Sequence, residues 1–174
     1  MMEKLTINDF DEAYALFQKA FIPAELRPYK KMKPLFEQNQ LIIYGYKDKQ
    51  KLVATLLVWE LENCIFWENF AVDESLRGQG IGSRVLEEVK AMYQDKTIIL
   101  EVETPFDEMS QRRIGFYQRH EFMLNPYSYI QPTLDVNPTN VKLQLMSYPY
   151  IIDESQYQRI KKEIFKIVYL KEED

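Results

Sequence analysis

The chain has 174 residues, of which 46% are apolar and 28% are charged, and its formal net charge is −5. This composition is ordinary for a globular protein and excludes a disordered chain or a coiled coil. A nucleic-acid-binding protein usually has a basic surplus or a basic stripe, and the sequence shows neither. We therefore expect a single domain over residues 1–174 that does not bind nucleic acid.

Single cysteine and histidine residues limit the chemistry of the chain. Cys64 cannot form an intramolecular disulfide, and with His120 alone a zinc site of the usual Cys/His type cannot be built. We expect no metal site, and interpret Cys64 as a small core residue and His120 as a surface or capping residue at a helix end. Because the sequence has no apolar run long enough to span a bilayer and no signal peptide, we expect a cytoplasmic protein without membrane contact.

The N-terminal part of the sequence predicts two helices. Asp9 and Glu12 have the spacing of a helix N-cap and its capping box. A helical apolar stripe follows, formed by Ala13, Leu16, Phe17 and Ala20. Pro23 and Pro28 interrupt this stripe, and a second short helix is expected around 32–38.

The middle of the sequence predicts a sheet. Three strand-like runs cover 41–46, 52–61 and 64–72, and the short loops between them favour antiparallel neighbours. A helix over 82–93 and a strand over 97–102 complete a β-α-β unit, in which strands 64–72 and 97–102 run parallel.

The rest of the sequence predicts a helix over 110–119, a pair of strands near 122–130 and 141–147, and a final amphipathic helix. The apolar face of that final helix carries Ile160, Ile164, Ile167 and Val168. The order of elements indicates an α/β fold with a sheet of mixed direction, not a barrel or a bundle.

Residues 70–83 form the most informative stretch, in which a strand ends, three glycines alternate with other residues, and a helix begins. Gly78, Gly80 and Gly82 are three of only 5 glycines in the chain. Glycine adopts left-handed backbone angles without penalty, and a helix N-terminus adds unpaired N–H donors and the positive end of the helix dipole. Arg77 can add a charge-assisted contact. The stretch therefore predicts a pyrophosphate cradle, and we prefer this to a loop in which glycine only turns the chain.

Two other phosphate-binding motifs do not fit this stretch. The sequence has no Gly-Lys-Ser/Thr run of a Walker loop. A dinucleotide-binding fingerprint needs a third glycine at the position that Ser83 occupies.

The segment 77–82, Arg-Gly-Gln-Gly-Ile-Gly, is similar to the Arg/Gln-x-x-Gly-x-Gly/Ala signature of the GNAT family of N-acetyltransferases. The resemblance implies a mixed, mostly antiparallel central sheet flanked by helices, with parallel strands 64–72 and 97–102 that splay apart at the cofactor site. It implies acetyl-CoA as co-substrate, with backbone groups of Ala71 and Val72 along the pantetheine arm. The residues that would surround the pyrophosphate are Arg77, Gly78, Gln79, Gly80, Ile81, Gly82 and Ser83.

A second part of the resemblance lies in residues 110–122. The segment Phe116-Tyr117-Gln118-Arg119 and Phe122 match the family pattern, whereas its usual Asn, Ala and Gly are replaced by Ser110, Arg113 and Glu121. The resemblance implies that Tyr117 lies near the thioester sulfur and protonates the departing thiolate. The simpler interpretation is one packed aromatic residue among 12 tyrosines.

A carboxylate is the expected catalytic base. An amine acceptor is protonated at neutral pH and must lose a proton before it can attack. Glu68 alternates with Phe66 and Phe70 on one face of a strand that leads into the cradle, so it could accept this proton directly or through a water. A simply solvated strand glutamate is an equally good interpretation, and Glu101 and Glu103 are weaker candidates.

These features predict an acetyl-CoA-dependent N-acyltransferase that transfers an acetyl group to a primary amine by direct attack in a ternary complex. The alternatives are a non-catalytic acyl-CoA-binding regulatory module on the same fold and an unrelated α/β protein whose loop binds another phosphate. The family places its acceptor at the early helices and the late hairpin, here 21–36 and 123–145, where Tyr29, Tyr127 and Tyr129 offer aromatic lining. The expected partner is a small-molecule or peptide amine, and a homodimer is left open.

Overall fold

The protein is described from a computed structural model that covers residues 1–134 and 140–171. The chain forms two compact units, which are described separately: residues 1–59 with 67–94, and residues 60–66 with those from 95 onward. The prediction of one domain over 1–174 stays a prediction.

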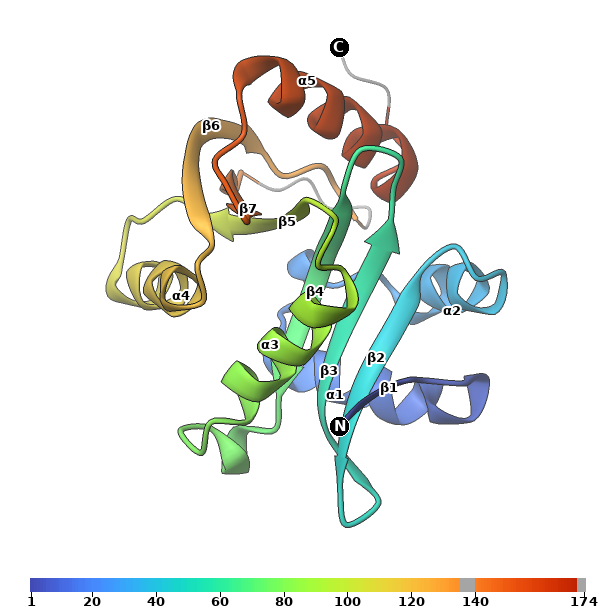
Figure 1. The fold of residues 1–174 in the computed structure, drawn as a ribbon. Helices are drawn as coiled ribbons and strands as arrows, with labels where there is room; N and C mark the ends of the chain where they lie inside the picture. The colour runs from blue at the N-terminus through green and yellow to red at the C-terminus, as the bar shows by residue number, and fades with distance from the viewer. Residues whose placement is uncertain (135–139, 172–174) are drawn as a thin grey trace. The chain divides into compact units, whose positions relative to one another are not determined.

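Among the described residues, seven strands form one sheet that helices flank (Figure 1). The strands are β1 (Met2–Lys4), β2 (Ile42–Asp48), β3 (Lys51–Glu60), β4 (Ile65–Val72), β5 (Ile98–Glu103), β6 (Met123–Ile130) and β7 (Lys142–Tyr148). Their hydrogen-bonded order is β1-β2-β3-β4-β5-β7-β6. This arrangement confirms the predicted α/β fold with a mostly antiparallel sheet.

In the first unit, β2 pairs antiparallel with both β1 and β3. The turn between β2 and β3 is made by Lys49 and Gln50 with φ angles of 48° and 69°, the backbone geometry of a tight hairpin turn. The sequence does not predict β1, because three residues are too short to show an alternating pattern.

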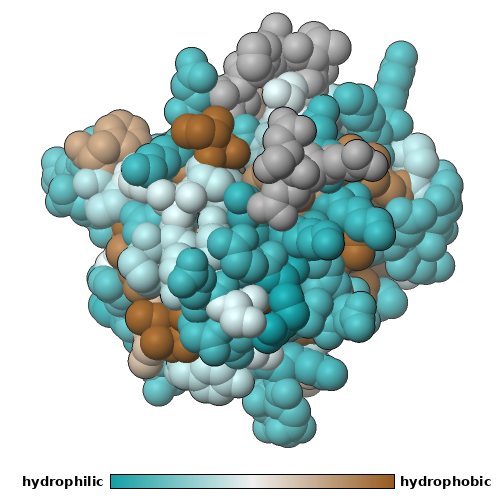
Figure 2. Space-filling model, turned by 90° about the horizontal axis from the view of Figure 1, so that it is seen from above, coloured by the Kyte–Doolittle hydropathy of each residue, from teal (hydrophilic) through white to brown (hydrophobic). Residues whose placement is uncertain are grey.

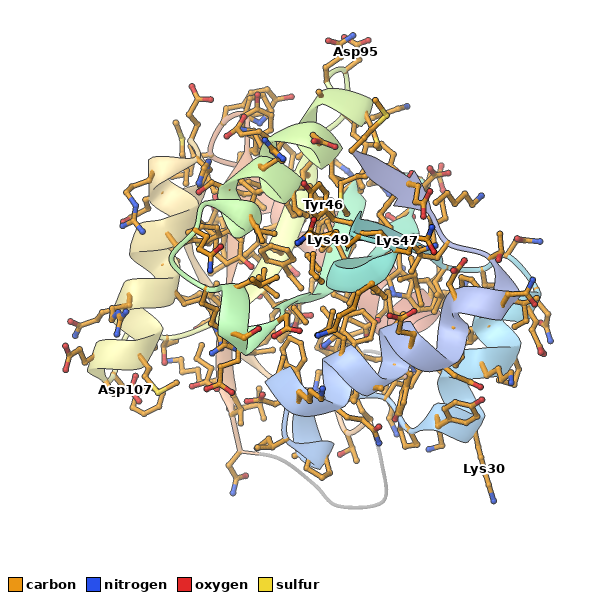
Figure 3. All side chains as sticks on the ribbon, turned by 90° about the horizontal axis from the view of Figure 1, so that it is seen from below. Lys30, Tyr46, Lys47, Lys49, Asp95 and Asp107 are labelled. Carbon is orange, nitrogen blue, oxygen red and sulfur yellow. The ribbon has the colours of Figure 1, made fainter. Side chains whose placement is uncertain are left out.

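The helices of the first unit cover its strands on both faces. They are α1 (Phe10–Ala20), α2 (Tyr29–Glu37) and α3 (Ile81–Met92), with short 3-10 turns η1 (Ile7–Asp9), η2 (Pro23–Glu25) and η3 (Glu74–Leu76). α1 and α3 lie on opposite sides of the strands in Figure 1 and again in the view from below in Figure 3. Because both faces are covered, β3 is buried at every position from 52 to 59 and reads as a continuous apolar run.

The start of α1 differs from the prediction. Asp9 directly precedes the helix, but its carboxylate accepts hydrogen bonds from the backbone N and the hydroxyl of Thr6, at 2.8 and 2.9 Å. Glu12 instead accepts from the backbone N of Leu52 at 2.9 Å. The predicted capping box of Asp9 and Glu12 is therefore wrong, because the turn η1 precedes the helix and Thr6 forms the box with Asp9.

In the second unit, β7 pairs antiparallel with both β5 and β6. Its helices are α4 (Glu108–Arg119) and α5 (Glu154–Glu163), followed by a π-helical turn η4 (Ile164–Val168). Ile160, Ile164 and Val168 are buried as predicted, but Ile167 is 41% exposed. The wider i→i+5 winding of the π-helical turn changes the period and moves Ile167 off the apolar face.

In the view of Figure 2, apolar residues form small separate patches among hydrophilic ones. Within residues 1–134 and 140–171, the helices are all too short or too polar to cross a membrane.

Candidate functional site

The loop that follows β4 is fixed by Asp73. Its carboxylate accepts from the backbone N and the hydroxyl of Ser75, at 3.0 and 2.7 Å, and pairs with Lys51 at 3.0 Å. The hydrogen bonds from Ser75 and Lys51 lower the pKa of Asp73 to about 2. Asp73 is therefore ionised at neutral pH and holds the turn η3 that leads into the glycines.

Gly78 and Gly80 both have a φ angle of 78°, a left-handed conformation that residues with a Cβ rarely adopt. A Cβ built at either position meets no atom within 4 Å. Glycine is therefore required here by the backbone angle and not by crowding inside the protein. The exposed space beside both residues is open to a ligand.

The N-terminus of α3 has the properties of an anion site. Gly80 is the N-cap and has no side chain that could cap the helix, whereas Asp107 and Asp153 cap α4 and α5. The first N–H groups of a helix have no intrahelical acceptor and lie at the positive end of its dipole. In the first turn of α3, the guanidinium of Arg84 donates to the hydroxyl of Tyr46 at 2.8 Å. Tyr46 is labelled in Figure 3. The predicted cofactor residues 77–83 thus form one exposed loop and the helix turn that follows it.

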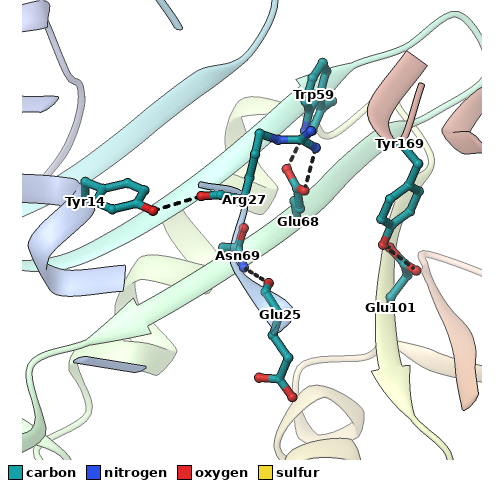
Figure 4. Close-up of polar contacts among 8 residues, drawn as sticks. All are labelled: Tyr14, Glu25, Arg27, Trp59, Glu68, Asn69, Glu101 and Tyr169. Carbon is teal, nitrogen blue, oxygen red and sulfur yellow. Dashed lines mark hydrogen bonds and ion pairs between the residues drawn. The ribbon is translucent and has the colours of Figure 1, made fainter. Parts of the chain in front are cut away.

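Glu68 lies in a buried polar cluster (Figure 4). Its Oε1 pairs with Nη2 of Arg27 at 3.0 Å, and its Oε2 accepts from the indole N–H of Trp59 at 2.8 Å. The side chains of Glu68 and Arg27 are each only 5% exposed. The interpretation of Glu68 as a solvated strand residue is therefore wrong.

The carboxylate of Glu68 can still accept further hydrogen bonds. An ionised carboxylate offers about four lone-pair sites, and Arg27 and Trp59 each use one of them. Because so little of the side chain is exposed, a water is a better intermediary than direct contact with a substrate. The arrangement can hold a negative charge in a fixed orientation.

The segment that carries Arg27 is attached at further points. The hydroxyl of Tyr14 donates to the backbone O of Arg27 at 2.9 Å, and Nδ2 of Asn69 donates to the backbone O of Glu25 at 3.5 Å. Asn69 is buried, and its Oδ1 has no hydrogen-bond partner among the residues that the structure covers. A buried acceptor without a donor costs about 1–3 kcal/mol, so this oxygen is suited to a water or to an N–H group of a ligand.

The sequence does not reveal Arg27, Trp59 or Asn69 as members of this cluster. A glutamate inside a sheet needs a buried partner, which is a signal that some cation approaches Glu68. It cannot identify which of 22 basic residues does so, because Arg27 lies 41 residues away.

Tyr117 lies on α4 and is half-buried. Its ring packs against Phe116 and Phe122, with centroid distances of 5.4 and 5.7 Å. Burial raises the pKa of Tyr117 to about 12, against the opposite effect of the Arg113 charge. Because its pKa is raised, the hydroxyl keeps its proton at neutral pH. It makes no hydrogen bond with any residue in the described ranges, so its O–H can donate to a ligand.

The second carboxylate candidate, Glu101, meets a residue that the sequence places at the acceptor border. It accepts from the hydroxyls of Tyr129 and Tyr169, each at 2.8 Å. Burial and the charge of Glu101 raise the pKa of Tyr129 well above its usual value. Both phenols therefore act as donors to this carboxylate, and Tyr169 is a member that the sequence does not reveal.

The remaining candidates have structural surroundings. Tyr127 stacks on Tyr157 with ring centroids 4.4 Å apart, and in the other unit Tyr29 donates to Asp11 at 2.5 Å. Within the described ranges, Glu103 makes no side-chain hydrogen bond. Residues 135–139 of the expected acceptor border 123–145 lie outside the described residues.

Cys64 and His120 have the structural roles that the sequence predicts. Cys64 is buried, and burial raises the pKa of its thiol, so it is unsuited to act as a nucleophile. His120 is the C-cap residue of α4 and lies against the ring of Phe116. In the part of the chain that the structure describes, no group of three or more His, Cys, Asp or Glu residues could hold a metal ion.

Comparison with known proteins gives a consistent result. The model of the family described as "Acetyltransferase (GNAT) family" matches residues 10–122. A curated protein of Bacillus subtilis (strain 168), "Putative acetyltransferase YjbC", is 26% identical over 161 residues, which cover 90% of this chain and 80% of that protein.

Solved structures show the same fold. A protein of Bacteroides thetaiotaomicron, "Putative acetyltransferase from GNAT family", is 28% identical and superposes with a TM-score of 0.89. The match covers 97% of this chain and 98% of that protein. A GNAT family acetyltransferase of Elizabethkingia anophelis, solved with acetyl-CoA bound, is 13% identical with a TM-score of 0.62 and covers 86% and 97% of the two chains.

Proposed function

The chain belongs to the GNAT family of acetyltransferases, and from this premise we propose that it transfers an acetyl group from acetyl-CoA to a primary amine. The observation that carries the proposal is the segment 77–83, which is an exposed loop and the first turn of α3. It combines two glycines at a φ of 78° with open space beside them and a helix N-terminus whose N-cap is a glycine without a capping side chain. These are the requirements for binding a diphosphate through backbone N–H groups.

Acetyl-CoA is the proposed co-substrate. The backbone N–H groups of residues 77–83 would hold its pyrophosphate, with the cationic Arg77 and Arg84 close by in sequence. Backbone groups of Ala71 and Val72, at the end of β4, would pair with the pantetheine arm. The relative from Elizabethkingia anophelis, which was solved with acetyl-CoA, supports this choice of ligand.

The proposed reaction is a direct attack in a ternary complex. The acceptor ammonium gives a proton through a water to the carboxylate of Glu68, and its nitrogen then attacks the carbonyl carbon of the thioester. The C–S bond breaks, and the hydroxyl of Tyr117 gives its proton to the thiolate of CoA. The attacking nitrogen loses its second proton, through water, to the Tyr117 phenolate, which restores the acid. The products are the N-acetylated amine, CoA and one proton, which Glu68 releases to solvent.

Two observations support these roles. The carboxylate of Glu68 is held in a fixed orientation by two donors, and the hydroxyl of Tyr117 keeps its proton because burial raises its pKa to about 12. Glu101 is the second candidate for the base, since Tyr129 and Tyr169 orient its carboxylate in the same way. The acceptor border with Tyr29, Tyr127 and Tyr129, the cytoplasmic location and the open question of a homodimer stay predictions.

A panel of amines tests the proposal. The protein is mixed with acetyl-CoA and with alkylamines, polyamines, amino-sugar compounds and peptides with a free N-terminus, and release of the CoA thiol is followed. We expect thiol release that depends on one class of amine. A protein that binds acetyl-CoA and releases no thiol with any amine would instead be the regulatory module.

A further inference from the structure

The orientation of the Glu68 carboxylate is set by one residue of β3 and one residue of the segment between α1 and α2. The terminal torsion of a glutamate has a broad preference of its own, so an unassisted carboxylate rotates readily. Here Arg27 holds one oxygen at 3.0 Å and Trp59, near the end of β3, holds the other at 2.8 Å. Donors on both oxygens leave one rotation of the carboxylate.

The two donors are also fixed relative to each other. The guanidinium carbon of Arg27 lies 5.6 Å from the ring centroid of Trp59, within the range of a cation–π contact. The segment between α1 and α2 therefore reaches Glu68 through a guanidinium that contacts both the carboxylate and the indole ring.

Stability alone does not account for this cluster. A buried ion pair loses about as much by desolvation as it gains by attraction, and apolar residues of similar volume stabilise such a position equally well or better. Both partners here are 5% exposed, so desolvation is nearly complete. The cluster gives a defined position of a charge on the strand that leads into the loop 77–83.

We propose that Arg27 and Trp59 are positioning residues for Glu68, which orient its carboxylate toward the water that carries the proton of the acceptor amine. This inference rests on the proposed function, and it assigns to the segment between α1 and α2 a part in the proton transfer. Neither residue touches the substrate; both act through the carboxylate.

The test is a set of single and double variants with matched measurements. Trp59→Phe removes the N–H donor and keeps an aromatic ring, and Arg27→Met removes the guanidinium and keeps a long apolar side chain. Each is made alone and in the Glu68→Gln background. Tyr14→Phe is the control, because it removes a bond to the same segment without removing a donor to Glu68. Thermal unfolding and acetyl-CoA affinity are measured for every variant.

We expect Trp59→Phe and Arg27→Met each to lower kcat by up to about 10²-fold, the effect of a small misplacement of a catalytic group, with unchanged acetyl-CoA affinity. In the Glu68→Gln background they should lower kcat no further, because coupled residues are not additive. Tyr14→Phe should keep its kcat. If Arg27→Met does not fold, Trp59→Phe decides by the same criterion.

Three results would overturn the inference. Losses that add fully to that of Glu68→Gln would show that Arg27 and Trp59 act elsewhere. An equal loss of kcat in Tyr14→Phe would show that the segment is only a structural support. Full activity of both Trp59→Phe and Arg27→Met would remove the positioning role and leave the proposed function intact, whereas a wild-type protein without turnover would remove both.

Discussion

Gly80 provides a prediction that separates backbone strain from ligand binding. Its φ angle is 78°, and an added Cβ meets no atom within 4 Å. A residue with a Cβ pays about 1–2 kcal/mol for the left-handed conformation. No clash adds to this strain, so we expect Gly80→Ala to lower the free energy of unfolding by about 1–2 kcal/mol. In a chain of this length, each kcal/mol of lost stability lowers Tm by about 2–4 °C.

Gly115 is the matched control for this loss of stability. It lies within α4, where a Cβ would make an ordinary contact at 3.6 Å with Arg119. Alanine is favoured over glycine inside a helix by about 1 kcal/mol. Gly115→Ala should therefore raise Tm, and a rise for Gly80→Ala as well would refute the argument from the backbone angle.

A negative charge introduced at position 80 tests whether the pyrophosphate of acetyl-CoA binds there. A carboxylate about 4 Å from a unit negative charge is repelled by about 1 kcal/mol in water, so the two charges of a pyrophosphate give about 2 kcal/mol. This corresponds to an affinity about 30-fold weaker for Gly80→Glu than for Gly80→Gln, which has the same size without the charge. Isothermal titration with acetyl-CoA at low salt measures the difference. Equal affinity of wild-type protein and a folded Gly80→Glu variant would refute the pyrophosphate site.

Three further predictions concern single side chains. Tyr117→Phe should lower kcat by about 10²–10⁴-fold with little change in acetyl-CoA affinity, as loss of a general acid does; intact turnover with a lower Tm would show a packing role only. Glu68→Gln should lose most rate at low pH, where more of the acceptor is protonated, and an unaltered pH–rate profile would move the base to Glu101, with Glu101→Gln as the comparison. The pKa of Asp73 is lowered from 3.8 to about 2 in the folded protein, so its contribution to stability is complete above the unfolded value and is lost as the pH falls toward 2. Asp73→Asn should therefore lose less stability than wild-type protein between pH 4 and pH 2 in thermal unfolding, and equal losses would contradict a stabilising carboxylate.

The loop 77–83 is predictable from the sequence because its parts adjoin one another along the chain. A strand, three glycines and a helix start follow in order, and α3 begins within one residue of its predicted start. The left-handed angles of Gly78 and Gly80 follow from the same local pattern. Local backbone chemistry determines the angles of the two glycines, whereas the ion pair of Asp73 with Lys51, which holds the turn before them, is not part of that pattern.

The surroundings of the carboxylates are not predictable in this way. Glu68 meets Arg27 and Trp59, and Glu101 meets Tyr169, which lies 68 residues away. Such pairs depend on which strands become neighbours and on how the segments outside the sheet cross it. The same limit explains why the predicted capping box of Asp9 and Glu12 is wrong. The carboxylate of Asp9 accepts from Thr6 and from Lys47 on β2.

Transfer of a labelled acetyl group tests the central claim most directly. The protein is incubated with acetyl-CoA carrying a ¹³C-labelled acetyl group and a mixture of primary amines, and both the amines and the intact protein are analysed by mass spectrometry. We predict a labelled N-acetyl amine together with protein that carries no acetyl group, since the amine attacks the thioester directly. A mixture in which bound acetyl-CoA stays intact and no amine gains the label would contradict an acetyltransferase activity.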